Sequence, residues 1–270
     1  MSFRSLLFVP GARPDRFQKA VGVGADAVCI DLEDAVPPGQ KDAARHATLD
    51  FIAQTEMRGL GVRINAVHTP DCMTDLRAIG TARKRPGFVM IAKVDSAQDL
   101  ALVRQAIGED APLWPIIESA EGLRHAWEIA SADAVAGVLF GAVDFAADLG
   151  CTMDWEPLLY ARGALAAAAA RGHRQLLDSP FVDVRDLAGL EEATTRARVM
   201  GFTGRACIHP DQVPVVNRLY TPTAAEITQA RRVLNAFNAT GGGPALLDGK
   251  LIELPVVRQA VRVLERAGEV

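Results

Sequence analysis

The stretch AVCIDLED, residues 27–34, is an apolar run that does not alternate with polar residues and that carries three acids near its end. Such a run indicates a strand buried on both faces, which is typical of parallel sheets covered by helices. Seven further runs of this kind occur along the chain: SLLFVP (5–10), GVRIN (61–65), GFVMIAK (87–93), LWPIIES (113–119), VAGVLFGAVD (135–144), QLLDSP (175–180) and GRACIHP (204–210).

Helix-like stretches separate these runs, at about 14–21, 40–55, 97–107, 121–130, 156–171, 187–200 and 210–219. Eight strand–helix units within about 220 residues predict an α/β fold of the TIM (β/α)8 barrel type. The alternative, an open doubly wound sheet, would carry a GxGxxG phosphate loop after an early strand. Gly22 and Gly24 precede a strand instead, so we expect a barrel domain over residues 1–221.

Residues 222–270 depart from this repeat and predict a C-terminal helical extension. One helix is expected over about 223–237, before a loose stretch with three consecutive glycines at 241–243. The second helix has an apolar stripe at helical spacing, formed by Leu254, Val257, Val261 and Leu264. Because this stripe is too apolar to face water, we expect the extension to act as a lid or as a contact between subunits of a homo-oligomer.

Composition and charge exclude several classes of protein. Hydrophobic residues make up 49% of the 270 and charged residues 23%, which rules out wholesale disorder. The net charge of −4 argues against a nucleic-acid partner. No apolar run reaches the roughly 18 residues that span a bilayer, and Pro10 and Gly11 interrupt the N-terminal run. Four cysteines without a CxxC pair indicate reduced thiols, so we expect a cytoplasmic protein without a membrane partner.

Acidic side chains follow several of the predicted strands, and in a barrel the carboxyl ends of the strands form the active-site face. Crowded carboxylates repel one another unless a cation lies among them. Glu118 and Asp144, one unit apart, therefore predict a metal site, and oxygen ligands favour Mg²⁺ or Mn²⁺ over Zn²⁺. Asp31, Glu33 and Asp34 are candidates to hold metal-bound water. The alternative is that these acids cap the helices that follow them.

Basic residues also lie at this predicted face. Arg63 suits bidentate binding of a carboxylate or an enolate, or a structural ion pair with the acids of residues 31–34. Lys93 either neutralises the acids, which we favour, or acts as a Schiff-base nucleophile. Arg13 and Arg16 follow the first strand, where they either hold phosphates or form a solvated helix face. His209 precedes a predicted helix, and a structural role is favoured over a catalytic one.

Several segments occur in order that together resemble the citrate lyase beta-subunit-like family of the HpcH/HpaI aldolase superfamily. They are LFVPGARPDRFQKA, AVCIDLEDAV with GQKDAAR, VRIN, PIIESAEGL, LFGAVDFAADLG and GFTGRACIHPDQVPVVN. The resemblance covers essentially the whole chain. It implies a Mg²⁺-dependent TIM-barrel lyase that cleaves or forms carbon–carbon bonds of acyl thioesters, and relatives that use coenzyme A bind it near the PGARPDRF-like segment.

The resemblance also implies roles for single residues. Arg63 matches a substrate-binding arginine, Glu118 matches a metal ligand that contacts the substrate, and Asp144 matches the second metal ligand. The acids of DLED match residues that hold metal-bound water. The chain departs from the family at Val143, where an acid is frequent, and at Glu253, where an Asp can serve a neighbouring subunit's active site.

We therefore expect a carbon–carbon lyase that cleaves a citryl-, malyl- or citramalyl-CoA-like 3-hydroxyacyl thioester into an acyl thioester and a 2-oxo acid. Arg63, Glu118 and Glu253 are its candidate catalytic residues, and Arg13 and Arg16 join Arg63 and Glu118 as candidates for substrate binding. The resemblance implies a homotrimer or a higher homo-oligomer. Two alternatives are a metal-dependent aldolase acting on non-thioester oxo acids, and a subunit active only within a larger lyase complex.

Overall fold

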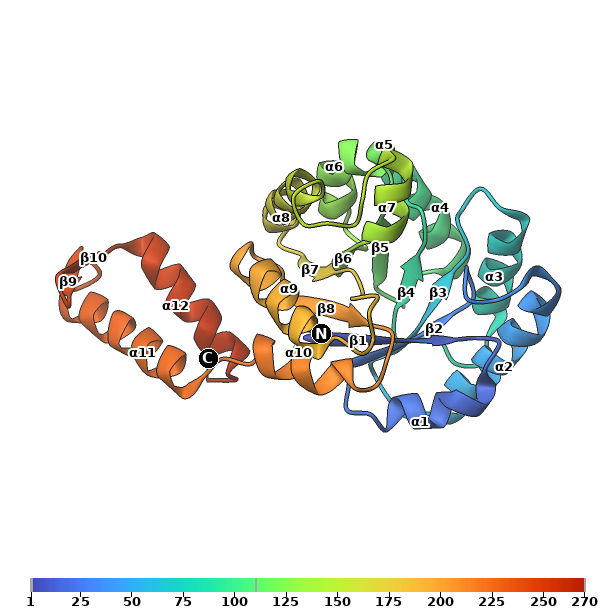
Figure 1. The fold of residues 1–270 in the computed structure, drawn as a ribbon, viewed down its shortest axis with the longest axis horizontal. Coiled ribbons are helices and arrows are strands. Elements are labelled where there is room, and N and C mark those ends of the chain that lie inside the picture. The colour runs from blue at the N-terminus through green and yellow to red at the C-terminus, as the bar shows by residue number, and fades with distance from the viewer. Residues whose placement is uncertain (1, 110, 270) are drawn as a thin grey trace. The chain divides into compact units, whose positions relative to one another are not determined.

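The computed structural model describes residues 2–109 and 111–269, and in it eight parallel strands close into a barrel in sequence order (Figure 1). The register closes where Leu6 of the first strand pairs with Ala206 of the last. Every predicted apolar run overlaps one of these strands, so the predicted TIM barrel is confirmed. The strands are β1 (Ser5–Pro10), β2 (Ala27–Asp31), β3 (Leu60–Ile64), β4 (Val89–Ile91), β5 (Leu113–Ile117), β6 (Gly137–Phe140), β7 (Gln175–Asp178) and β8 (Gly204–Cys207).

Helices surround the strands and cover the outer face of the barrel (Figure 1). Two of them, α3 and α7, lie outside the stretches predicted to be helical, and the helix expected over 121–130 is broken at His125 into α5 and α6. The helices of the barrel are α1 (Phe17–Val21), α2 (Lys41–Gln54), α3 (Pro70–Thr81), α4 (Ala97–Ile107), α5 (Ala120–Arg124), α6 (Ala126–Ser131), α7 (Ala142–Leu149), α8 (Leu159–Gly172), α9 (Leu187–Val199) and α10 (Gln212–Tyr220).

An aromatic cluster closes the amino-terminal end of the barrel. Phe3 stacks on Trp114 with ring centroids 5.1 Å apart, and Phe88 lies 5.5 Å from Phe3. Gly61 and Gly137 leave room for these rings, because a Cβ atom at either position would lie within 2.6 Å of Phe88 or Trp114. Apolar side chains thus fill this end of the barrel, as expected of a fold whose polar site lies at the carboxyl ends of the strands.

The four cysteines agree with the expectation of reduced thiols. All of them are free, and Cys29, Cys72 and Cys207 are buried. Burial raises the pKa of the Cys207 thiol to about 12, so this thiol stays protonated at neutral pH. Within the described part of the chain, no helix is both long enough and apolar enough to cross a membrane.

The chain divides into two compact units, residues 1–217 and 218–270, whereas the sequence placed the boundary at 221/222. Within the second unit, helices α11 (Ala224–Ala239) and α12 (Leu254–Arg266) are joined by a hairpin of β9 (Ala245–Leu247) and β10 (Lys250–Ile252). Val257 and Leu264 of the predicted apolar stripe belong to the core of this unit, with Ala230 and Val233 of α11. Two of the four stripe residues thus pack within the unit, whereas Leu254 is exposed, and the predicted lid or subunit contact stays a prediction.

Candidate active site

Glu118 and Asp144 line one cavity of about 260 Å³ at the carboxyl end of the barrel. Glu118 directly follows β5, and Asp144 lies in the first turn of α7, after β6. The Glu118 side chain fits there because Gly141 has no side chain: a Cβ atom at Gly141 would lie 2.5 Å from Oε2 of Glu118. The two acids that the sequence predicted to bind metal are thus brought together in one cavity.

The environment of Glu118 disfavours a lone negative charge. Burial raises the pKa of its carboxyl group to about 8, the charges of Asp144 and Glu33 act in the same direction, and Arg63 and the backbone N–H of Lys93 oppose them. That N–H donates to Oε1 of Glu118 at 2.6 Å. Because the other oxygen, Oε2, lies beside Gly141 in the cavity wall, a cation there would relieve the repulsion between the two acids.

The donor set fits Mg²⁺. Among residues 2–109 and 111–269, no group of three or more His, Cys, Asp or Glu side chains converges into a complete metal cage. Mg²⁺ does not need one, because it keeps several water molecules and is held by one or two carboxylates. Glu118 and Asp144 could hold it through oxygen atoms alone, as the sequence predicted. The described residues that line this cavity include no His or Cys, which argues against Zn²⁺.

Arg63, at the end of β3, lines the same cavity and forms the predicted ion pair. Its Nε and Nη2 donate to the two carboxylate oxygens of Asp31 at 2.6 and 2.5 Å. Its Nη1 lies 3.2 Å from Oε2 of Glu33, a buried atom that has no hydrogen bond. The guanidinium also stacks 5.1 Å from the ring centre of Phe8. Nη1 is therefore the nitrogen of Arg63 with the weakest protein partner.

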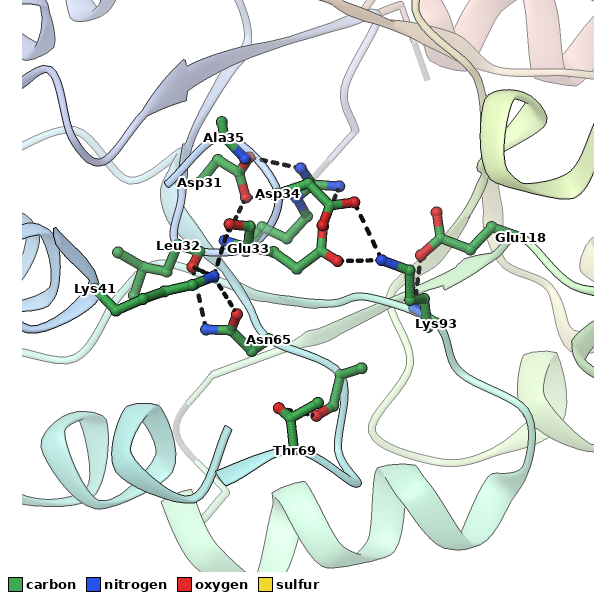
Figure 2. Close-up of polar contacts among 12 residues, drawn as sticks. Asp31, Leu32, Glu33, Asp34, Ala35, Lys41, Asn65, Thr69, Lys93 and Glu118 are labelled. Atoms are coloured by element: carbon green, nitrogen blue, oxygen red, sulfur yellow. Dashed lines mark hydrogen bonds and ion pairs between the residues drawn. The ribbon is translucent and has the colours of Figure 1, made fainter. Parts of the chain in front are cut away.

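The loop after β2 is held by Lys41, a residue to which the sequence analysis gave no role. Its Nζ donates to the carbonyl oxygens of Leu32 and Glu33, both at 2.8 Å, and to Oδ1 of Asn65 at 2.6 Å (Figure 2). Asp31 adds to this order because its carboxylate accepts the backbone N–H groups of Glu33 and Ala35. The acids of DLED are thus presented by a rigid loop.

Lys93 neutralises this acidic loop, in line with the favoured prediction. Its Nζ donates to Glu33 and, at 3.1 Å, to Asp34, and Figure 2 shows it between those acids and Glu118. Partial burial would lower the pKa of its ammonium group, but the hydrogen bonds and charges of Glu33 and Asp34 raise it overall. A lysine held charged in this way is a poor nucleophile, so the geometry disfavours the Schiff-base alternative.

A second cavity, of about 320 Å³, adjoins the first, and the two share Phe8, Pro10 and Ile208. Arg16, Lys19 and His209 line it, which gives it a basic wall. Nδ1 of His209 accepts the backbone N–H of Asp211 at 3.3 Å, which supports a structural role for this histidine. Arg13, predicted beside Arg16, is instead held in an exposed ion pair with Asp15 at 2.7 Å.

Glu253 belongs to the C-terminal unit and is exposed at the residue that precedes α12. Its side chain does not cap the helix. The catalytic role that the sequence predicted for it stays a prediction.

Residues 4–210 match the family model described as HpcH/HpaI aldolase/citrate lyase. The chain belongs to this family. Residues 164–268 also match the model described as C-C bond lyase of the TIM-barrel fold.

Members of the family are similar to this chain over nearly its whole length. A citrate lyase subunit beta-like protein of Mycobacterium tuberculosis is 38% identical, with 97% of this chain and 95% of that protein covered. A (3S)-malyl-CoA thioesterase of Cereibacter sphaeroides is 36% identical, with 98% and 94% covered. Among solved structures, the chain is similar to protein CitE from Mycobacterium tuberculosis, crystallised in complex with magnesium, acetoacetate and coenzyme A. The two sequences are 34% identical, the match covers 99% of each chain, and the TM-score is 0.86.

Proposed function

We propose that this chain is a Mg²⁺-dependent carbon–carbon lyase that cleaves a 3-hydroxyacyl-CoA thioester into an acyl-CoA and a 2-oxo acid. The observation that carries the proposal is the placement of Glu118, Asp144 and Arg63 around one cavity. The family's description as aldolase/citrate lyase supports the reaction class. The CitE complex, which contains magnesium and coenzyme A, supports the cofactor and the thioester.

The chemistry requires the hydroxyl proton at C3 to leave, the C2–C3 bond to break, and a proton to reach C2 of the released thioester. Bound Mg²⁺ supplies a positive charge that lowers the pKa of the substrate hydroxyl group and polarises the forming carbonyl. Glu118 and Asp144 hold that charge in place through their carboxylate oxygens. The hydrogen bond from the Lys93 backbone holds the Glu118 carboxylate in the position from which it would bind the cation.

Arg63 is placed to stabilise the negative charge that develops on the thioester when the bond breaks. Its Nε and Nη2 are fixed by Asp31, which leaves Nη1 as the donor for a substrate oxygen. A guanidinium that is already held in place stabilises an enolate without reorganising. Asp31 is therefore the residue that orients Arg63, and Glu33, with one buried oxygen that makes no hydrogen bond, is available to accept from a bound water.

The second cavity is our candidate for the phosphate-bearing part of coenzyme A. Its wall includes the basic residues Arg16 and Lys19, and it shares Phe8, Pro10 and Ile208 with the first cavity. This arrangement would place the thioester next to Glu118 while the phosphates contact Arg16. Arg13 keeps its predicted role only if its ion pair with Asp15 opens.

The proposal includes a homo-oligomer, of which a trimer is the form implied by the family resemblance. The C-terminal unit would then serve as lid, with Glu253 as the group that exchanges a proton with C2 of the substrate.

A related activity, thioester hydrolysis, is favoured by the similarity to a (3S)-malyl-CoA thioesterase. Incubating the protein with Mg²⁺ and malyl-CoA, citramalyl-CoA or citryl-CoA separates the two functions. A lyase releases a 2-oxo acid and acyl-CoA with no free thiol, whereas a thioesterase releases free coenzyme A. Asp144→Ala should abolish the reaction and Glu192→Gln, an exposed residue of α9, should not. Cleavage without a 2-oxo acid product would refute the proposed lyase.

A further inference from the structure

The loops that follow β7 and β8 border both cavities at the carboxyl end of the barrel. Ser179 and Pro180, in the loop after β7, line the first cavity. Ile208, in the loop after β8, lines the first cavity and also the second, whose wall includes its neighbour His209. A shift of the loop after β8 would therefore change the wall that the two cavities have in common.

Gln212, the first residue of α10, is completely buried and joins these two loops. Its Oε1 accepts the backbone N–H groups of Ile208 at 2.9 Å and of His209 at 3.3 Å. Its Nε2 donates to the carbonyl oxygen of Phe181 at 2.8 Å. A buried amide that finds partners at both of its ends is held in one orientation. The side chain of Gln212 thus ties the loop after β8 to the loop after β7.

The loop after β7 is itself firmly held. The side chain of Arg205 in β8 is buried, and its Nη1 donates to the carbonyl oxygen of Ser179 at 2.8 Å. The same guanidinium pairs with Asp178, whose Oδ1 accepts the backbone N–H of Ser179 at 3.0 Å. Because a buried Arg–Asp pair holds both backbone groups of Ser179, this loop gives Gln212 a fixed support.

We infer that Gln212 is a positioning residue for the acyl-CoA substrate: it holds Ile208 on the shared wall, and so it sets the affinity for a ligand that extends through both cavities. The affinity for a 2-oxo acid confined to the first cavity does not depend on it. This inference rests on the proposed function and adds a residue to it. Gln212 is not among the described residues that line either cavity, so it acts through Ile208, whose side chain is 43% exposed.

The test measures the affinities of the Mg²⁺-loaded protein for acetyl-CoA and for pyruvate, each alone, by titration calorimetry. Gln212→Met has a side chain of similar length without the amide. It should weaken acetyl-CoA binding by about tenfold and change pyruvate binding by no more than about twofold. A residue that only stabilised the start of α10 would not change the ratio of the two affinities, because both are properties of the folded protein.

The matched control is Gln175→Met, at the amino-terminal end of β7. The Gln175 amide also accepts a backbone N–H, that of Phe3, and donates to the hydroxyl group of Ser2. Its loss removes comparable hydrogen bonds far from both cavities, so both affinities should stay unchanged. Should Gln212→Met fail to fold, Gln212→Asn takes its place, since it keeps an amide on a side chain too short to reach both loops.

A double variant shows whether Gln212 acts through Ile208. Ile208→Ala shortens a partly exposed side chain, so the protein should fold, and it should weaken acetyl-CoA binding without affecting pyruvate binding. If the two residues act as one unit, Gln212→Met should lower the acetyl-CoA affinity no further in the Ile208→Ala protein.

The outcomes separate this inference from the proposed function. Equal weakening of both ligands by Gln212→Met, or unchanged acetyl-CoA binding in either single variant, would overturn the inference and leave the lyase proposal intact. Additive losses in the double variant would overturn it as well, since Gln212 would then not act through Ile208. If the unmodified protein binds pyruvate but not acetyl-CoA, the proposed thioester substrate is wrong, and the inference is wrong with it.

Discussion

The backbone N–H of Lys93 donates a hydrogen bond of 2.6 Å to Oε1 of Glu118, and Lys93 has a φ of 52°. A non-glycine residue in the left-handed region costs about 1 kcal/mol, so the conformation persists only where surrounding contacts hold it. Here the ammonium group of the same residue contacts Glu33 and Asp34. Lys93 thus joins the acidic loop after β2 to the buried carboxylate after β5.

Glu118 should lower the stability of the metal-free protein at alkaline pH. Its pKa in the folded state is raised from 4.5 to about 8, so the folded state disfavours ionisation and loses stability as the pH rises from 4.5 to 8. Glu118→Gln removes this penalty and should stabilise the metal-free protein by about 1–3 kcal/mol at pH 8. Urea denaturation in EDTA measures the gain, which should vanish near pH 4. A loss of stability at pH 8 would contradict the burial argument.

Gly141→Ala should displace Glu118. The added Cβ atom would lie 2.5 Å from both Cβ and Oε2 of Glu118, and Cβ cannot move without the backbone. We expect at least tenfold weaker Mg²⁺ binding and roughly a hundredfold lower activity, because small shifts of a catalytic group are costly. The matched control is Gly163→Ala in α8, where an added Cβ atom would meet nothing within 4 Å. This substitution should stabilise the helix slightly and leave Mg²⁺ binding unchanged. Normal Mg²⁺ binding by Gly141→Ala would show that Glu118 is not the ligand.

Lys93 should not form a Schiff base. Its ammonium group is held charged by Glu33 and Asp34, which raise its pKa, and a charged amine does not attack a carbonyl. Borohydride added during turnover should leave the peptide that contains Lys93 unmodified in mass spectrometry. A reduced adduct on this residue would show a Schiff-base mechanism and contradict the proposed metal-dependent one.

The sequence predicted the polar residues of the site better than their partners. Strand ends can be located from apolar runs, so Glu118, Asp144 and Arg63 could be assigned to one face. The role of Lys41 could not be found in this way, because its acceptors are two backbone carbonyls and Asn65, and the sequence does not show where these converge. Gly141 was missed for a similar reason, since its importance comes from the position of Glu118.

The fold was predictable in its strands and less so in its helices. Fully buried parallel strands leave continuous apolar runs, which are easy to locate. The sequence does carry a start signal for helix α3, namely Thr69 followed by Pro70. In the structure, the Thr69 side chain accepts a hydrogen bond from the backbone N–H of Cys72. Its buried face, however, includes Asp75, which is paired with Arg45, and a charged residue at a core position obscures the helical pattern.

Glu253 should act across subunits if the lid proposal is correct. Arg63→Ala should remove the stabilisation of the enolate, and Glu253→Gln should remove proton exchange at C2, so each variant alone should be inactive. If the two residues serve one site from different subunits, mixed oligomers of the two chains should regain part of the activity. The controls are each variant mixed with itself, which should stay inactive. Full activity of Glu253→Gln alone, or a monomeric mass by light scattering, would refute a shared site.

The most direct test of the account is the Mg²⁺ dependence of carbon–carbon cleavage, measured as 2-oxo acid released from a 3-hydroxyacyl-CoA thioester. EDTA should abolish the activity of the unmodified protein and added Mg²⁺ should restore it. Glu118→Gln and Asp144→Asn should lower the rate by several orders of magnitude at every Mg²⁺ concentration, with the fold retained by circular dichroism. Full activity of the metal-stripped protein, or of either variant, would contradict the proposal that these two carboxylates hold a catalytic metal.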